Sequence, residues 1–200
     1  MADGAQRLFV AVPVPQATRD ACRELIEPVR ATPFGRAARW VHVETLHLTL
    51  RFLGDTEPNR VSDVAAAVGA AAAPFAPFAV RLRGAGSFPP DARKIRALWL
   101  GIEEGARELA AILAALDVAL AAAGWPPDER PFRPHLTVAR MDRSAIRDAG
   151  LTAQALAAAA EDWTTSFIAE RVVLFRSHLG GGPPRHEPVV EVALHGEAAG

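Results

Sequence analysis

A chain of 200 residues, half of them apolar and 22% charged, is long enough to bury a sizeable core and too apolar to be disordered. Its formal net charge of −1 excludes a general attraction to nucleic acid, so any polyanionic ligand must be bound by a local cluster. The single cysteine, Cys22, excludes an intrachain disulfide and a cysteine-based zinc site. Neither a signal peptide nor a transmembrane stretch is recognisable, so we expect a cytoplasmic protein.

Hydrophobic periodicity, prolines and glycines divide the chain into strands and helices. Apolar positions that recur every three or four residues predict helices over 16–32, 57–73, 103–123 and 152–161. Runs of β-branched and aromatic residues predict strands over 7–13, 38–43, 46–54, 78–88, 94–102, 135–140, 164–179 and 189–196. Many connections between strands are short, which favours antiparallel sheets and an α+β fold over a doubly wound parallel sheet.

A short motif occurs twice in the chain. HLTLRF begins at His47, and HLTVAR begins at His135, 88 residues further on. From the composition, a random His-Leu-Thr is expected only about 0.03 times, so two copies are improbable by chance. We therefore expect residues 1–200 to form a single domain of two intimately packed lobes, each contributing one such strand.

The spacing within each motif has a mechanical meaning, because residues two apart in a strand share a face. His47, Thr49 and Arg51 are predicted on one face of the first strand, and its leucines face the core. In the same way, His135 and Thr137 share a face of the second strand. If the two lobes face each other, two imidazoles, two hydroxyls and nearby arginines line one cleft.

This set of groups suits a phosphate ligand. Hydroxyls and guanidinium groups bind phosphate oxygens, and two histidines with an ordinary pKa of about 6.5 can act as general base and general acid. In-line displacement at phosphorus needs those two proton transfers and requires no metal. We expect no cofactor and no metal, since the chain has no His-x-x-x-His pair and no clustered carboxylates of a metallohydrolase.

At this point the motifs carry a family resemblance. HLTLRFLG and PHLTVAR resemble the paired His-x-Thr motifs of the 2H phosphoesterase superfamily, and RLFVAVPVP, LWLGI and VVLFRSHLGGGPPRHEPV are similar to its RNA 2′,3′-cyclic phosphodiesterases, long called 2′-5′ RNA ligases. The resemblance implies a bilobal, pseudo-symmetric α+β fold with two antiparallel sheets flanking a central cleft and helices on the outside. It also implies metal-independent hydrolysis of RNA 2′,3′-cyclic phosphodiester ends to 2′-phosphomonoesters.

The same resemblance assigns roles by motif position. His47 would be the proton donor to the leaving 3′ oxygen, and His135 the base that activates water. Thr49 and Thr137 would hold the phosphate oxygens. Arg140, five residues after His135, matches a phosphate-contacting arginine of the family, but strict alternation places it on the opposite face unless the strand ends or bulges there.

One departure from the family is visible near the C-terminus. Family members often carry a tyrosine in the final loop, whereas this chain has no tyrosine and offers His186 in that neighbourhood. The resemblance therefore does not assign a substrate-binding role to this loop.

The remaining histidines and aromatic residues have simpler interpretations. His42, His178 and His195 are expected at the surface, and Trp99 and Phe52 in the core. Two alternatives to hydrolysis stay open: a non-catalytic RNA-end or nucleotide-binding module on the same fold, and 2′-5′ RNA ligation as the relevant direction. The expected partners are RNA ends or nucleotides with a 2′,3′-cyclic phosphate, and we expect a monomer with no membrane and no obligate protein partner.

Overall fold

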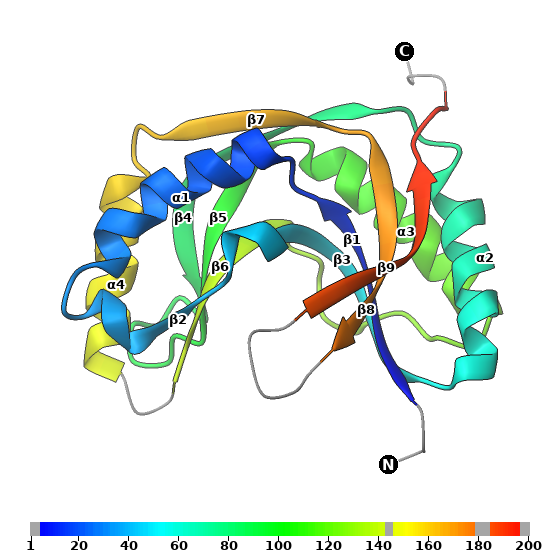
Figure 1. The fold of residues 1–200 in the computed structure, drawn as a ribbon, viewed down its shortest axis with the longest axis horizontal. Helices are drawn as coiled ribbons and strands as arrows, with labels where there is room; N and C mark the ends of the chain where they lie inside the picture. Colours follow the sequence, from blue (N-terminus) through cyan, green and yellow to red (C-terminus); the bar gives the residue numbers. More distant parts are fainter. Residues whose placement is uncertain (1–4, 143–145, 179–184, 197–200) are drawn as a thin grey trace.

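The structure of the chain is a computed structural model that describes residues 5–142, 146–178 and 185–196. In these ranges, nine strands form two antiparallel sheets (Figure 1). Sheet A has the strand order β3-β1-β8-β9, and sheet B has the order β2-β6-β5-β4-β7. The strands are β1 (Gln6–Pro13), β2 (Ala38–Trp40), β3 (His47–Thr56), β4 (Phe78–Phe88), β5 (Ala97–Glu104), β6 (His135–Met141), β7 (Thr164–Ala169), β8 (Arg171–His178) and β9 (Arg185–Ala193).

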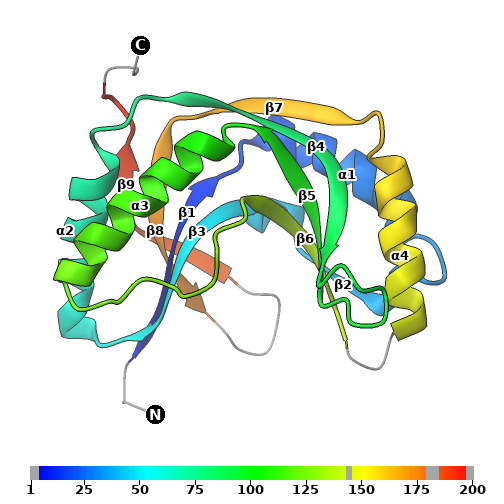
Figure 2. The same ribbon diagram turned by 180° about the vertical axis from the view of Figure 1, so that it is seen from behind.

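Four helices cover the outer faces of the two sheets. The helices are α1 (Gln16–Arg30), α2 (Val61–Ala72), α3 (Ala106–Ala122) and α4 (Ile146–Ala159). Two of them, α1 and α3, lie beside the sheet that does not contain the strand preceding them. Helix α1 follows β1 of sheet A but contacts α4 and β7 on the side of sheet B, while α3 follows β5 of sheet B but packs against α2 and β3. Figures 1 and 2 show the resulting pairs, α1 with α4 beside sheet B and α2 with α3 beside sheet A. Each sheet is therefore covered in part by a helix that follows, along the chain, a strand of the other sheet.

The helices form where the sequence periodicity predicts them, because one stripe of each is apolar. In α3, the residues Leu109, Ile112, Leu116 and Leu120 recur every three or four positions and are all at most 1% exposed. Burying a leucine or isoleucine side chain contributes about 1.5–3 kcal/mol. These four residues thus fix which face of α3 packs inward.

The two halves of the chain repeat one topology. The unit β1–α1–β3 supplies two neighbouring strands of sheet A, and the unit β5–α3–β6 supplies two neighbouring strands of sheet B. In each sheet the HLT strand, β3 or β6, pairs antiparallel with the strand that precedes its helix. The expected α+β class with two antiparallel sheets and a pseudo-symmetric plan is confirmed.

The prediction of one long strand over 164–179 is wrong. Strand β7 pairs with β4 in sheet B, whereas β8 pairs with β1 in sheet A, so the chain changes sheets at Glu170. At this crossing, the backbone N–H of Leu194 donates to the carbonyl of Glu170 over 2.8 Å. Glu170 and Arg171, both exposed, interrupt the apolar alternation at the crossing. Periodicity by itself does not identify the sheet to which each flanking strand belongs.

The helix predicted over 152–161 begins earlier, at Ile146. Thr152, the first residue of the predicted helix, lies inside α4 and is fully buried. Its hydroxyl donates to the carbonyl of Asp148, one turn back, over 2.6 Å, which satisfies the group without ending the helix.

Several other predicted boundaries shift by a few residues: α2 begins at Val61 rather than at 57, and β9 covers Arg185–Ala193 rather than 189–196. The strand expected over 38–43 is only β2, and a 3-10 turn at Val43–Thr45 separates it from β3. Helix α3 starts at Ala106 because Gly105 has φ +89°, a conformation that L side chains rarely adopt. In the described part of the chain, no helix has the length and apolar character needed to cross a membrane.

Candidate active site

The two predicted histidines begin the two HLT strands and are held in the same way. The Nδ1 atom of His47 lies 2.7 Å from the carbonyl oxygen of Thr45, and Nδ1 of His135 lies 2.6 Å from the carbonyl oxygen of Arg133. Both rings are half-buried. A carbonyl can only accept, so each Nδ1 carries a proton and each Nε2 is left for chemistry with a ligand.

The threonines follow their histidines on the same face of each strand. Leu48 and Leu136, between histidine and threonine, are buried in the core at 2% and 0% exposure. Thr49 and Thr137 are half-buried on the other face. Neither threonine hydroxyl makes a hydrogen bond to another described residue, so both are available as donors to a ligand.

Strict alternation fails after the threonine of β3. The pairing with β1 runs from Ala11–Thr49 directly to Val10–Arg51, so Leu50 is an extra residue, as in a β-bulge. As a result Arg51 turns into the interior, with 8% exposure, and Phe52 turns outward, with 57% exposure. The predictions of Arg51 on the histidine face and of Phe52 in the core are therefore wrong.

A second bulge occurs at the equivalent point of β6. The pairing with β5 runs from Trp99–Thr137 directly to Leu98–Ala139, so Val138 is the extra residue. Val138 and Ala139 are both buried, and Arg140 is exposed. The bulge therefore returns Arg140 to the face that carries His135 and Thr137, which is the condition that the sequence left open.

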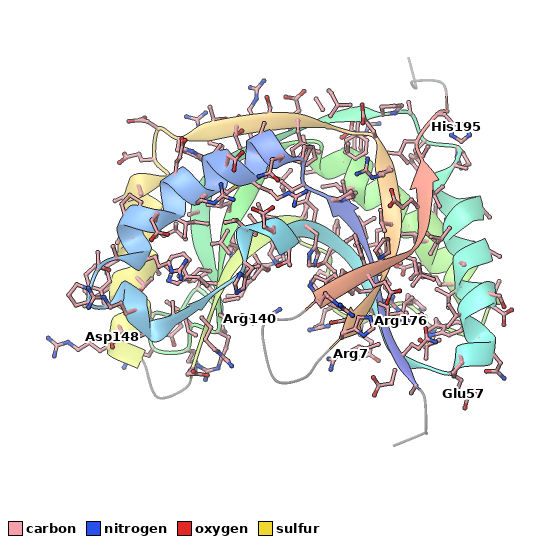
Figure 3. The ribbon with its side chains drawn as sticks, viewed as in Figure 1. Arg7, Glu57, Arg140, Asp148, Arg176 and His195 are labelled. Atoms are coloured by element: carbon pink, nitrogen blue, oxygen red, sulfur yellow. The ribbon has the colours of Figure 1, made fainter. Side chains whose placement is uncertain are left out.

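Arg140 lies close enough to both histidines to affect the pKa of each. Strands β3 and β6 are in contact although they belong to different sheets, and Figure 3 shows Arg140 reaching into the space between the sheets. Burial, together with the positive charges of His186 and Arg140, lowers the pKa of His47 to about 4. Burial also lowers the pKa of His135, again with a contribution from Arg140. One guanidinium group thus acts on both imidazoles.

Aromatic rings surround each histidine. On sheet A, the ring of His47 lies 4.8 Å from Phe9 and 5.2 Å from His186, measured between ring centroids. On sheet B, the ring of His135 lies 4.9 Å from Phe88 and 6.4 Å from Trp99. Rings in such contact fix the orientation of an imidazole and exclude water from its sides.

The prediction of Trp99 as a core residue is wrong. Its cross-strand partner is Thr137, so its half-buried ring lies on the histidine face of sheet B. The ring covers Gly86, where an added Cβ would stand 2.4 Å from its Cζ2 atom. The alternation of β5 with Leu98 and Leu100 carried the signal for this face.

Arg51, although directed away from the histidines, connects the two lobes. Its side chain donates to the carbonyl of Pro126 and lies 3.6 Å from the carboxylate of Asp117 in α3. Pro126 belongs to the segment that leads from α3 to His135. The buried guanidinium of β3 therefore helps to hold the approach to β6.

Three further histidines, His42, His178 and His195, lie at the surface. His42 and His195 are exposed, as predicted. His178 bonds Glu187 over 2.7 Å at the surface of sheet A. Among the described residues, no group of three or more histidine, cysteine or acidic side chains is arranged to hold a metal ion.

The chain is similar in sequence to several known proteins. RNA 2′,3′-cyclic phosphodiesterases of Geobacillus stearothermophilus and Methanothermobacter thermautotrophicus are 31% and 32% identical over 193 and 142 residues, or 96% and 71% of this chain. The chain spans 58% of the Geobacillus protein and 74% of the Methanothermobacter protein. The Escherichia coli RNA 2′,3′-cyclic phosphodiesterase is 30% identical over 94% of this chain and 97% of its own length.

Solved structures and a family-level match extend the comparison. The crystal structure of TT0787 from Thermus thermophilus superposes with a TM-score of 0.71 and 29% identity, covering 96% of this chain and 99% of that one. Escherichia coli LigT complexed with 3′-AMP gives a TM-score of 0.69 and 27% identity, covering 95% and 98%. The sequence pattern of the 2′-5′ RNA ligase superfamily matches residues 17–181. The family expected from the doubled motif is confirmed, and the chain belongs to the 2′-5′ RNA ligase superfamily.

Proposed function

We propose that this chain hydrolyses RNA 2′,3′-cyclic phosphodiester ends to 2′-phosphomonoesters, with His135 as general base and His47 as general acid. The observation that carries this proposal is the matched pair of imidazoles, each fixed through Nδ1 to a backbone carbonyl and each acted on by Arg140. The naming of its relatives as RNA 2′,3′-cyclic phosphodiesterases supports the same reaction.

The mechanism follows from the two free Nε2 atoms. Nε2 of His135 removes a proton from water as the water oxygen bonds to phosphorus. The bond from phosphorus to the 3′ oxygen breaks on the opposite side, and Nε2 of His47 gives its proton to that oxygen. The product has a 2′-phosphate and a free 3′-hydroxyl, and proton exchange with solvent restores both rings.

Three side chains are proposed to bind the phosphate. The hydroxyls of Thr49 and Thr137 lie beside their histidines and make no hydrogen bond to another described residue. Arg140 supplies a fixed positive charge on the same side. Donors and a cation that are in place before the reaction stabilise the charge that develops on the equatorial oxygens.

The lowered histidine pKa values fit a resting site without bound anion. Both imidazoles are neutral at neutral pH in the free protein, which prepares His135 to accept a proton. The negative charge of a bound phosphodiester opposes the charge of Arg140 and favours the protonated form of His47. Substrate binding thus supplies the condition under which His47 can act as an acid.

The proposal also includes the setting in which the enzyme works. The exchange of α1 and α3 between the sheets supports one domain of two interlocked lobes, and one chain supplies both histidines, so a monomer suffices. The single cysteine, Cys22, is buried and unpaired, which fits the cytoplasm. RNA ends or nucleotides with a 2′,3′-cyclic phosphate are the proposed substrates.

Product analysis with a 2′,3′-cyclic-ended oligonucleotide tests the reaction and the two roles. A 2′-phosphate product is expected, while a 3′-phosphate would reverse the leaving group and the assignments of His47 and His135. Binding without turnover would identify a non-catalytic RNA-end module. Activity is expected to be unchanged in EDTA, because imidazoles transfer the protons and no step uses a metal; loss of activity there would contradict the proposed chemistry.

A further inference from the structure

A third histidine lies against the proposed acid. His186 is near the start of β9, and its backbone pairs with Ser177 of β8. Strands β1 and β8 lie between β9 and β3 in sheet A. The ring of His186 nevertheless lies 5.2 Å from the ring of His47. The reason is a bulge in β9 at Val189, which interrupts the pairing with β8 and bends the strand. Figure 1 shows the first half of β9 crossing over β8 towards β3.

The ring of His186 stands nearly perpendicular to its neighbours. The interplanar angle is 88° with His47 and 79° with Phe9, while Phe9 and His47 are tilted by only 36° to each other. His186 and Phe9 thus hold His47 from two directions. The Nδ1 atom of His186 is buried and has no hydrogen-bond partner among the described residues.

The charges around the two rings are few. Strand β6 contributes Arg140, and β1 and β8 contribute the uncharged rings of Phe9 and Phe175. Strand β1 also contributes Arg7, which pairs with Ser177, the partner of His186, and with Asp55 of β3. The neighbours of His186 in β9 lie on the opposite face by alternation, where Glu187 contacts His178 and Arg176. No carboxylate of the described residues is among the groups that shift the pKa of either ring, so a second positive charge on the pair would be uncompensated.

We propose that His186 is a positioning residue for His47, which fixes the His47 ring against Phe9 and, by competing for the same proton, limits the two imidazoles to one positive charge. This inference rests on the proposed role of His47 as the general acid. On acidification, the first proton goes mainly to His186, and His47 stays neutral to lower pH. Two interacting imidazoles of this kind titrate as a pair.

The lowered pKa values agree with this order. Burial lowers the pKa of His186, while burial and the charges of His186 and Arg140 together lower that of His47 to about 4. A charge within about 5 Å disfavours a second charge of the same sign. The identity of residue 186 would therefore set the pH range over which His47 holds the proton that it gives to the leaving oxygen.

The test uses the full chain with ¹⁵N-labelled histidine, titrated by NMR and assayed with a 2′,3′-cyclic-ended oligonucleotide as a function of pH. His186→Phe keeps the ring and removes the titratable group, and His186→Gln keeps polarity without a charge. In both variants His47 is expected to titrate at higher pH than in the parent protein. Because activity requires the proton on His47, the alkaline limb of the kcat profile is expected to move to higher pH.

The matched control is His178→Phe, on the neighbouring strand and opposite face, which is expected to leave the His47 titration and the kcat profile unchanged. A merely structural role for His186 would lower kcat equally at every pH. The inference is overturned if His47 takes the first proton in the parent protein, or if its titration is the same in the parent and both His186 variants. Full activity of His47→Gln would instead remove the proposed function, and the NMR titration would still decide the order of protonation.

Discussion

Strands β3 and β6 carry the same motif on the same scaffold but end in different chemistry. Both place histidine and threonine on one face, bury the leucine between them, and bulge at the next residue. After the bulge, β3 continues with Arg51 and Phe52, and β6 continues with Ala139 and Arg140. The buried position thus holds an arginine in one strand and an alanine in the other, and the outward position holds a phenylalanine in one and an arginine in the other.

The difference shows how a symmetric scaffold makes an asymmetric site. Both bulges rotate the fifth residue after the histidine onto the side of the imidazole. On sheet A that residue, Phe52, joins the aromatic rings of Phe9 and Phe175, while on sheet B it is the cation Arg140. The same position in the two strands therefore presents an apolar ring in one lobe and a positive charge in the other.

Removal of either histidine, the group that both lobes share, is expected to have the largest effect on activity. His47→Ala and His135→Ala are each expected to lower kcat by about 10³-fold or more, because each removes one of two proton transfers. The double variant is expected to be little worse than either single one, since the residues act as a unit. Steady-state kinetics with His178→Ala as the control measures this, and retention of activity by either single variant would exclude that histidine from the mechanism.

A substitution that gives β6 the same residue as β3 at the fifth position after the histidine is expected to have the next largest effect on activity. Arg140→Phe gives β6 the residue of β3 and removes the phosphate cation, so kcat/KM should fall about 10²-fold. The control is Arg39→Ala, since Arg39 is the cross-strand partner of Arg140 but is exposed and paired with Asp142 over 2.9 Å. Equal effects of the two substitutions would mean that only the general positive charge of this edge matters.

Because His47 is buried in its neutral form, the free energy of unfolding is expected to fall as the pH is lowered. The pKa of His47 in the folded protein is about 4, below the ordinary value, so the folded state favours the neutral form. This contribution is complete above pH 6.5, where the unfolded chain is also neutral, and is lost as the pH falls to about 4. His47→Gln should reduce the loss by up to about 3 kcal/mol. Urea unfolding at pH 7.5 and pH 4.5 measures it; identical pH dependence in both proteins would contradict the buried neutral imidazole.

The buried position after the bulge, Arg51 in β3 and Ala139 in β6, is expected to affect stability more than activity. Arg51→Ala leaves the Asp117 carboxylate and the Pro126 carbonyl without their partner, and should lower the free energy of unfolding by about 2 kcal/mol. Arg81→Ala removes an exposed ion pair with Glu104 and should change it by less than about 1 kcal/mol. Denaturant unfolding compares the two, and a smaller effect for Arg51 would show that its buried contacts do not stabilise the lobe junction.

Much of the fold was readable from periodicity, because apolar stripes fix which face of an element is buried. The strands over 78–88 and 94–102 and the two HLT strands were predicted and are observed as β4, β5, β3 and β6. The division of 164–179 into β7 and β8 was not predicted, because periodicity does not identify the sheet to which a strand belongs. The exposed pair Glu170 and Arg171 was the available signal of the break. Trp99 was assigned to the core from its size, although its place between two buried leucines indicates the opposite face.

By itself, the sequence determined the family and the two strands that carry His47, Thr49, His135 and Thr137, because a period of two and a repeated motif are local properties. Only the tertiary structure decided the sides taken by Arg51, Phe52 and Arg140, because a bulge is a mismatch between two strands and depends on the partner's register. It also decided that His186 lies against His47, 139 residues earlier in the chain. Sheet pairing and the bend of β9 bring these rings together, and no spacing along the chain encodes that contact.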